Sequence, residues 1–298
     1  MLIRAFEEAL AGRKDHGFQL LSSGEEAVAV GLCSALNDDD QLLTGGRSIG
    51  PALARGLAPN RVMAELLGKS SGTNRGKGGR GHLADPAAGF FGAHAVVGGN
   101  ISIAAGVALS KQMSASKGIV AVLFGDGAFG AGGLHESLNI AAIWKLPLLF
   151  VCNNNQLSVS TPRAAALAPK NLSDIGVAFA MPSQTIDGMD VEMVAKTMRE
   201  AAEHARAGRG PAFIECISYR FASHSTTARE TRSRAELAAI RQKCPIVRYA
   251  AALTTAGILD AELRADLARQ VSEAVAGALA FADASEYPAT SEVLTDVW

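Results

Sequence analysis

The chain has 298 residues, of which 48% are hydrophobic, and its net charge of −1 corresponds to a pI near 6.6. This length and apolar content suffice for a large core, so we expect a single domain over residues 1–298. The near-neutral charge provides no basic surface, which argues against nucleic acid or an anionic membrane as a partner. No apolar run approaches the roughly 18 residues of a membrane span.

The N-terminal residues predict an amphipathic helix rather than a targeting signal. Apolar side chains recur at helical spacing from Leu2 to Leu10, so residues 2–12 should dock by one face. Glu7 and Glu8 are acidic where a targeting signal would be basic. The four cysteines lie far apart without metal-ligand spacing, which indicates reduced thiols and a cytoplasmic protein.

An arginine between glycines follows a second apolar helix, which is expected over residues 24–36. Arg47 lies in the segment LLTGGRSIGPALARG, which cannot form a regular helix. The planar fork of a guanidinium can bind a phosphate through two hydrogen bonds. Taken alone, however, such an arginine is more often an ordinary surface residue. A further helix is expected over residues 61–67.

Residues 70–100 are rich in glycine and in basic side chains. A long irregular segment inside a compact enzyme is usually functional, although the same composition also suits a flexible basic loop. His82 and His94 lie in this segment, and lone histidines are more often structural than catalytic. The next helix, expected over residues 100–111, is rich in small residues, so it could pack at a subunit interface or under the sheet.

A strand–helix–strand unit is predicted between residues 119 and 152. Two short apolar runs, at residues 119–124 and 146–152, flank a helix-period segment at residues 134–144. Apolar runs of this length are typical of buried parallel strands. The unit predicts a doubly wound, mainly parallel α/β fold.

Polar residues follow both of these predicted strands. Because the carboxyl ends of parallel strands meet at one edge of a sheet, we expect Asp126 and the carboxamides of Asn154 and Asn155 to face one crevice. The flanking glycines, Gly125 and Gly127, leave backbone amides free to bind an anion. Carboxylate and carboxamide oxygens suit Mg²⁺, which usually shares its ligand shell with phosphates. The pattern predicts a magnesium–diphosphate site, although Gly-Asp-Gly alone is also an ordinary turn.

The remaining residues predict two more strands and a helical C-terminal region. Residues 163–182 are expected to form an alanine-rich loop, and a strand is expected to end at Asp187. A strand within residues 211–221 delivers Arg220 and His224 to the ligand edge of the sheet. Helices are expected over residues 234–298. Four aliphatic residues recur at every fourth position there and predict core packing: Leu263, Leu267, Val271 and Val275.

These motifs resemble a known family. Gly-Asp-Gly, followed after 26 residues by Asn154-Asn155, resembles the thiamine-diphosphate motif. The segment GLHESLNIAAIWKLPLLFVCNNN resembles the corresponding segment of the alpha subunit of the decarboxylating first component of 2-oxoacid dehydrogenase complexes. This group contains pyruvate, branched-chain and acetoin dehydrogenases. The resemblance runs from Leu2 to the terminal LTDVW, and the helix that begins GEEA corresponds to the family's GQEA helix. It implies the thiamine-diphosphate-binding fold, with this chain as the diphosphate-binding domain.

The resemblance also implies roles for individual residues. The matching arginines hold the cofactor diphosphate, a turn contacts the aminopyrimidine, and YRFASHS resembles the family's YRxxGHS, whose histidine meets the reacting end of the cofactor. The implied cofactor-binding residues are Arg47, Ala95, Val97, Gly125, Asp126, Gly127, Ala128, Asn155 and Arg220. The implied Mg²⁺ ligands are Asp126, Asn155 and the backbone carbonyl of Leu157. The candidate catalytic residues are His224, His82 and His94.

Two departures from the family affect the expected substrate. Ile49 stands where relatives have an active-site histidine, and His94 stands where they usually have asparagine. An isoleucine can neither donate a proton nor bind a carbonyl. We therefore expect pyruvate and branched-chain 2-oxoacids to be poor donors unless His82, His94 or His224 compensates. A transketolase-like enzyme that moves a two-carbon ketol unit is the alternative.

The resemblance covers only half of a complete active site. In the family a beta subunit covers the aminopyrimidine and supplies the glutamate that activates it, and the subunits assemble as α2β2. Thiamine diphosphate provides an ylid and an electron sink, so the implied reaction cleaves a C–C bond beside a carbonyl and passes the acyl group to a lipoyl-bearing or acyl-carrier protein. A third alternative is a non-catalytic structural subunit, against which the retained cofactor residues argue.

Overall fold

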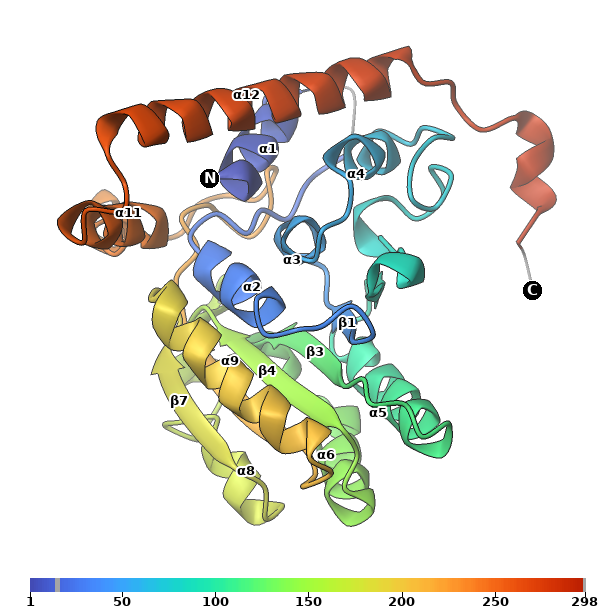
Figure 1. Cartoon of the computed structure of the whole chain (residues 1–298), viewed down its shortest axis with the longest axis vertical. Helices are drawn as coiled ribbons and strands as arrows, with labels where there is room; N and C mark the ends of the chain where they lie inside the picture. Colours follow the sequence, from blue (N-terminus) through green and yellow to red (C-terminus); the bar gives the residue numbers. More distant parts are fainter. Residues whose placement is uncertain (14–16, 297–298) are drawn as a thin grey trace.

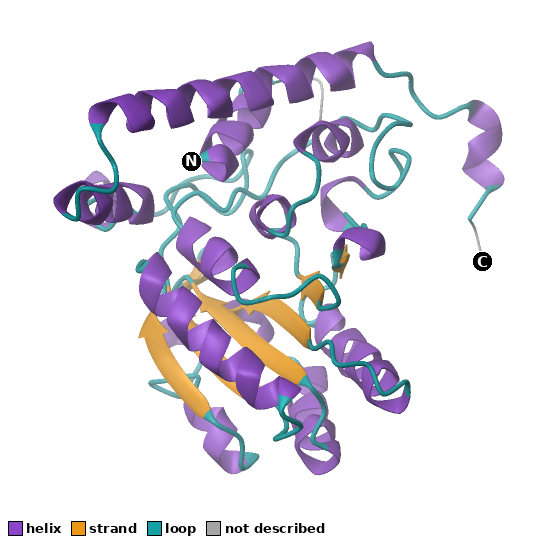
Figure 2. Ribbon diagram, in the orientation of Figure 1, coloured by secondary structure: helices purple, strands orange, loops and turns teal. Residues whose placement is uncertain are grey.

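The computed structural model describes residues 1–13 and 17–296, so the last two residues of the predicted C-terminal helical region lie outside the described part. Within these residues a six-stranded sheet has the order β2-β1-β3-β4-β8-β7, and every neighbouring pair is parallel (Figures 1 and 2). Its strands are β1 (Gln41–Thr44), β2 (Phe90–Ala93), β3 (Val120–Gly125), β4 (Leu148–Asn154), β7 (Ser183–Asp187) and β8 (Ala212–Ile217). This confirms the predicted doubly wound α/β fold.

Helices cover both faces of the sheet, which explains why its central strands are apolar throughout. Alternate residues of β3 belong to different buried clusters: Ala121 packs with α2 (Glu26–Cys33) and α9 (Val191–Arg206). Val122 packs instead with α5 (Gly99–Met113) and α6 (Gly132–Trp144). Figure 1 shows α9 lying across the sheet on the side opposite α6. The small residues of α5 thus lie under the sheet and against α6, one of the two positions expected for this helix.

A helical layer sits beyond the sheet (Figure 1). It contains α1 (Leu2–Ala11), α3 (Ile49–Ala54), α4 (Pro59–Leu66), α10 (Arg234–Arg241), α11 (Pro245–Thr255), α12 (Ala261–Ala284) and the 3₁₀ turn η4 (Thr290–Leu294). The long helix α12 packs against α1 and α4. Its second half is buried through Val275, whereas Leu263 and Leu267 are 42% and 38% exposed. The prediction that these two leucines pack in the core is therefore wrong, because the first half of α12 contributes nothing to the buried cluster.

Short elements connect the larger ones. They are the 3₁₀ turns η1 (Gly79–Gly81), η2 (Pro86–Ala88) and η3 (Asp126–Ala128), the hairpin strands β5 (Leu157–Ser158) and β6 (Thr161–Pro162), and the helices α7 (Arg163–Ala166) and α8 (Asp174–Ala178). The two helices correct the expectation of a loop over residues 163–182. Alanine has the highest helix propensity, and a helix of one or two turns is too short to show a period.

The direction in which successive strands are added to the sheet reverses between β1 and β3, and this switch point creates a binding crevice. The connection from β1 leads outward to β2, whereas that from β3 leads the other way to β4. Ligands in open parallel sheets bind at such a switch point, outside the carboxyl ends of the strands. In the described part of the chain, no helix is long and apolar enough to cross a membrane. All four cysteines are buried and free, and burial raises the pKa of Cys33 to about 12, which makes its thiol unreactive.

Candidate functional site

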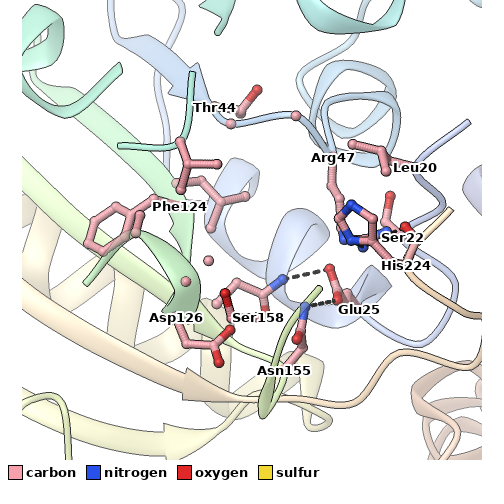
Figure 3. A pocket seen from close by; sticks show the side chains of 18 of the residues that line it. Leu20, Ser22, Glu25, Thr44, Arg47, Phe124, Asp126, Asn155, Ser158 and His224 are labelled. Atoms are coloured by element: carbon pink, nitrogen blue, oxygen red, sulfur yellow. Dashed lines mark hydrogen bonds between the residues drawn. The ribbon is translucent and has the colours of Figure 1, made fainter. Parts of the chain in front are cut away.

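A cavity of about 430 Å³ opens at this switch point (Figure 3). Its size is within the range of small-molecule sites. The segments that follow three neighbouring strands line it: Gly45–Arg47 after β1, Gly125–Ala128 after β3, and Asn153 with Asn155 at the end of β4. Its wall needs a glycine, because a Cβ on Gly127 would lie 2.6 Å from Ser158 Oγ. The structure thus gathers most of the sequence-predicted cofactor residues around one cavity.

Asp126 begins the turn η3 at the carboxyl end of β3 and is 2% exposed. Burial raises the pKa of its carboxyl group, and the charges of Arg220 and Arg163 act in the opposite direction. Its buried Oδ2 atom has no hydrogen-bond partner among the described residues. A buried carboxylate oxygen without a partner is costly unless a cation or donor completes the site. This oxygen fits the metal-ligand role that the sequence predicts.

The strand geometry of β4 separates the three consecutive asparagines. Side chains alternate along a strand, so Asn153 and Asn155 face the cavity whereas Asn154 turns away and donates to Glu215 Oε1 at 2.6 Å. The motif therefore brings Asn155, and not Asn154, to the site. Asn155 Oδ1 accepts a hydrogen bond from the backbone nitrogen of Leu157 at 3.2 Å, and Leu157 also lines the cavity.

Arg47 and His224 meet on the opposite wall. Arg47 donates through Nη1 to the carbonyl of Leu21 at 2.6 Å and through Nη2 to that of His224 at 2.9 Å. Burial lowers the pKa of His224, and the charges of Arg47 and Arg220 lower it further. The imidazole is therefore neutral at neutral pH, and it can accept or donate a proton at the cavity wall.

Arg220 is 1% exposed and lies on a second cavity of about 230 Å³. Leu157, Val159 and His224 line both cavities, so the two adjoin. Arg220 donates through Nη2 to the carbonyl of Val159 at 2.8 Å, while its buried Nε and Nη1 have no partner in the described ranges. Burial lowers the pKa of Arg220 to about 10, so it remains a cation. A buried cation with two free donors fits an anionic ligand.

The remaining predicted residues lie at the rim. Ala95 and Val97 line the cavity, and Val97 is 69% exposed. His82 and His94 stack edge to face with their ring centroids 5.8 Å apart, but neither lines the cavity. Among the candidate catalytic histidines, only His224 therefore borders the cavity of this chain.

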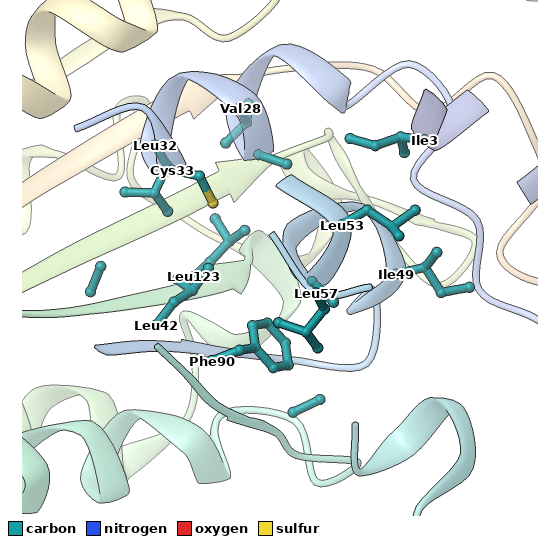
Figure 4. Close-up of a cluster of buried hydrophobic side chains, with 14 of the residues drawn as sticks. Ile3, Val28, Leu32, Cys33, Leu42, Ile49, Leu53, Leu57, Phe90 and Leu123 are labelled. Atoms are coloured by element: carbon teal, nitrogen blue, oxygen red, sulfur yellow. The ribbon is translucent and has the colours of Figure 1, made fainter. Parts of the chain in front are cut away.

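Ile49 does not face the cavity. It is the first residue of α3, it is 1% exposed, and it packs in the hydrophobic cluster with Ile3, Leu53 and Leu57 (Figure 4). Arg47, two residues earlier, lines the cavity, but the start of α3 turns Ile49 toward the core. The expected change of donor therefore rests on the motif position of Ile49 alone, because its side chain does not line the cavity.

The glycine-rich segment wraps around a buried glutamate. Glu65 of α4 is 0% exposed, and its Oε2 accepts from the amides of Asn74 and Gly76 at 2.7 and 2.9 Å. Its Oε1 accepts from the amides of Gly78 and Gly79, each at 2.8 Å. These amides bind an internal carboxylate and are not free for a phosphate. The segment is thus an ordered loop rather than a flexible basic one.

Sequence reasoning missed Glu25, which lies inside the cavity. It precedes α2, is 2% exposed, and accepts from both Asn153 and Asn155 (Figure 3). Burial raises the pKa of its carboxyl group, and the charges of Arg47 and Arg220 lower it. The sequence feature that marks it is the motif GEEA, in which Glu25 stands where the family motif has glutamine.

The predicted metal ligands in the cavity are all oxygen atoms, from carboxylate, carboxamide and backbone groups. Within residues 1–13 and 17–296, no three His, Cys, Asp or Glu side chains form a metal-binding group. The cavity holds two carboxylates, Asp126 and Glu25, but Glu25 already accepts hydrogen bonds from Asn153 and Asn155. The side-chain ligands on offer are therefore the carboxylate of Asp126 and the carboxamide oxygen of Asn155. This donor set suits Mg²⁺ that shares its ligands with a phosphate.

Comparisons with known proteins agree with the resemblance seen in the sequence. Residues 2–291 match the family model described as the dehydrogenase E1 component. The alpha subunit of acetoin:2,6-dichlorophenolindophenol oxidoreductase from Bacillus subtilis (strain 168) is 39% identical over 304 residues, which cover 99% of this chain and 90% of that protein. The pyruvate dehydrogenase E1 component subunit alpha from Rhizobium meliloti (strain 1021) is 36% identical over 304 residues, which cover 100% of this chain and 87% of that protein. These names give no support to the ketol-transferring alternative. The chain belongs to the dehydrogenase E1 component family.

Proposed function

We propose that this chain is the alpha subunit of a thiamine-diphosphate-dependent dehydrogenase that cleaves a C–C bond beside a carbonyl. The observation that carries the proposal is a cavity at the carboxyl edge of a parallel sheet, where the unpartnered Oδ2 of Asp126 adjoins basic side chains. A carboxylate and arginines together suit a magnesium diphosphate, whose metal needs oxygen ligands and whose phosphates need cations.

Each cavity residue has a role in this proposal. Asp126, Asn155 and the backbone carbonyl of Leu157 bind Mg²⁺. Arg47 and the buried Arg220 would bind the diphosphate oxygens, and the backbone from Gly125 to Ala128 lines the same cavity. Thiamine diphosphate, when bound, supplies a nucleophilic carbon and an electron sink. His224, kept neutral by burial and by neighbouring arginines, exchanges a proton at the reacting end.

The pocket requires a second polypeptide. Ala95 and Val97, proposed to contact the aminopyrimidine, lie at the cavity rim, and Val97 is 69% exposed. Exposed apolar residues beside a cavity are consistent with a partner surface. We propose that a beta subunit covers this rim in an α2β2 assembly. His82 and His94 lie beside the same rim, so their proposed catalytic roles depend on the assembled complex.

The donor is an acyloin or a 2-oxoacid, as the names of the relatives suggest. The acyl unit passes to a lipoyl-bearing carrier, with an acyl-carrier protein as the other candidate. The four buried free cysteines are consistent with a reducing, cytoplasmic location. Residues 1–298 would then act as one diphosphate-binding domain whose helices from residue 234 onward form a C-terminal extension.

Calorimetric titration of thiamine diphosphate and Mg²⁺ into the complex tests the site. Asp126→Ala removes a charged ligand and should weaken binding at least about tenfold, since even outer ligand-shell losses cost about 10–100-fold. Asp187→Ala is the matched control, because Asp187 also ends a strand but pairs with Arg248 outside the cavity. Unchanged affinity in Asp126→Ala would remove this site from the proposal.

Subunit dependence is tested with the purified chain. Alone, it should bind the cofactor weakly and turn over no substrate, because half of the pocket is missing. Addition of the beta subunit should restore both properties. Turnover of substrate by the chain without a second polypeptide would contradict the subunit assignment.

A further inference from the structure

Glu25 places a carboxylate inside a cavity proposed to bind an anion. The backbone delivers it through Gly24, whose φ of +99° and whose closeness to the carbonyl of Tyr219 exclude a side chain at that position. Glu25 is 2% exposed and lines the cavity in which Asp126 and Arg47 also lie (Figure 3). A buried charge is energetically costly unless hydrogen bonds or opposite charges compensate for it.

The contacts of Glu25 determine how two carboxamides are oriented. Asn155 Nδ2 donates to Oε1 at 2.7 Å, and Asn153 Nδ2 donates to Oε2 at 2.8 Å. An ionised carboxylate only accepts hydrogen bonds, so both asparagines must turn their NH₂ groups toward it. Their oxygen atoms therefore point away: Asn153 Oδ1 accepts from Ser218 Oγ at 2.5 Å, and Asn155 Oδ1 lies by the Leu157 amide.

The orientation of Asn155 matters because a metal binds only its oxygen. A carboxamide rotated by 180° would present NH₂, which repels a cation. With Glu25 ionised, rotation of Asn155 would place its oxygen against a carboxylate oxygen in a buried site, where like charges repel strongly. Burial raises the pKa of Glu25, while the charges of Arg47 and Arg220 and the hydrogen bonds from both asparagines act in the opposite direction. The geometry itself, with an asparagine NH₂ group on each carboxylate oxygen, is that of a group that accepts on both sides.

We propose that Glu25 is a positioning residue for the metal: it holds Asn155 with Oδ1 toward Mg²⁺ and thereby sets the Mg²⁺ requirement of cofactor binding. The inference rests on the proposed function, because it assumes the magnesium diphosphate site. It assigns Glu25 no contact with the metal, the cofactor or the substrate.

Glu25→Ala tests this role by removing the acceptor, whereas glutamine, the residue of the family motif, could still accept from Asn155 through its one oxygen. Without an acceptor at position 25, the carboxamide of Asn155 is free to rotate. In the αβ complex, the Mg²⁺ concentration for half-maximal thiamine diphosphate binding should rise about tenfold or more, the scale of losses around metal ligands. At saturating Mg²⁺, the affinity for thiamine diphosphate should return to within about threefold of the unchanged complex, because the diphosphate contacts remain. Calorimetry measures both quantities without catalysis.

Glu26→Ala is the matched control. Glu26 is also buried, on the same helix start, but it accepts from the Gly24 amide at 2.9 Å and pairs with Arg4, and it does not line the cavity. It should alter thermal stability without altering the Mg²⁺ requirement. An equal rise in both variants would overturn the proposal, as would an unchanged requirement in Glu25→Ala or a loss of affinity that persists at saturating Mg²⁺.

A double-mutant cycle tests whether Glu25 acts through Asn155. Asn155→Ala alone should raise the Mg²⁺ requirement, and Glu25→Ala on that background should add less than about threefold, because the group it orients is gone. Additive effects would overturn the proposal. If the wild-type complex binds no thiamine diphosphate, the proposed function falls together with this inference. If it binds and responds to Asp126→Ala but not to Glu25→Ala, only this inference falls.

Discussion

Ionisation of Glu7 should make the fold less stable as the pH rises. Glu7 lies on α1, is 0% exposed, and accepts from the Ser22 amide at 2.8 Å and from the Ser22 hydroxyl at 2.6 Å. Burial raises the pKa of its carboxyl group from 4.5 to about 7, although the hydrogen bonds from Ser22 act in the opposite direction. This contact lies beside the proposed site, because Ser22 also lines the cavity.

The sign and size of the effect follow from this pKa. Because the folded-state pKa lies above that of the unfolded chain, the folded protein holds the proton more tightly. The stability contributed in this way is fully present below pH 4.5 and is lost as the pH rises through 7. At about 1.4 kcal/mol per pKa unit, the total loss is about 3 kcal/mol, of which about 2 kcal/mol falls between pH 5.5 and 8.5.

Urea unfolding of the wild-type chain and of the Glu7→Gln variant at several pH values measures this loss of stability. The free energy of unfolding of the unchanged chain should fall by about 2 kcal/mol relative to the variant between pH 5.5 and 8.5, because the amide does not titrate. Glu8→Gln is the control, since Glu8 is the exposed neighbour and should show no such change. A difference between chain and variant that stays constant within about 0.5 kcal/mol over this range would refute the reasoning.

Three further substitutions test the fold around the site. Glu65→Ala should speed hydrogen exchange at Gly76 and Gly78, because four buried amides lose their acceptor; unchanged exchange would exclude Glu65 as the organiser of that loop. Gly24→Ala should cost more than about 1 kcal/mol of unfolding free energy in urea, because its Cβ would lie 2.2 Å from the Tyr219 carbonyl oxygen; equal stability would contradict the assigned backbone. Ile49→His should lower stability by about 1–3 kcal/mol without improving pyruvate turnover in the αβ complex, because the imidazole would enter the core; a gain in turnover at full stability would show that residue 49 faces the substrate.

The central strands were predictable because they are buried on both faces. Such strands read as continuous apolar runs, and the predicted runs at residues 119–124 and 146–152 overlap β3 and β4. β1 and the edge strand β2 are only four residues long and gave no run to detect. The short helices α7 and α8 were missed for the same reason of length.

The site was predictable in its ligands but not in the groups behind them. Asp126 and Asn155 follow strands that the sequence itself marks, so their common edge could be foreseen. Glu65 is a buried carboxylate, yet nothing in its immediate neighbours distinguishes it from a solvated glutamate. Glu25 was marked only by standing where the family motif has glutamine. Ile49 shows a different limit, because matching a motif position does not fix the direction in which its side chain points at the start of a helix.

The all-parallel sheet has a consequence for how the protein folds. Parallel neighbours cannot be joined by a tight turn, so each pairing closes a long loop, and β4 pairs with β8 across more than fifty residues of intervening chain. Folds dominated by such distant pairings fold slowly, because chain entropy is lost before the contacts form. Glu25, Arg47, Asp126, Asn155 and Arg220 come from five separate parts of the chain, so no fragment can assemble the cavity. Capture of the cofactor would therefore report that the whole sheet has formed.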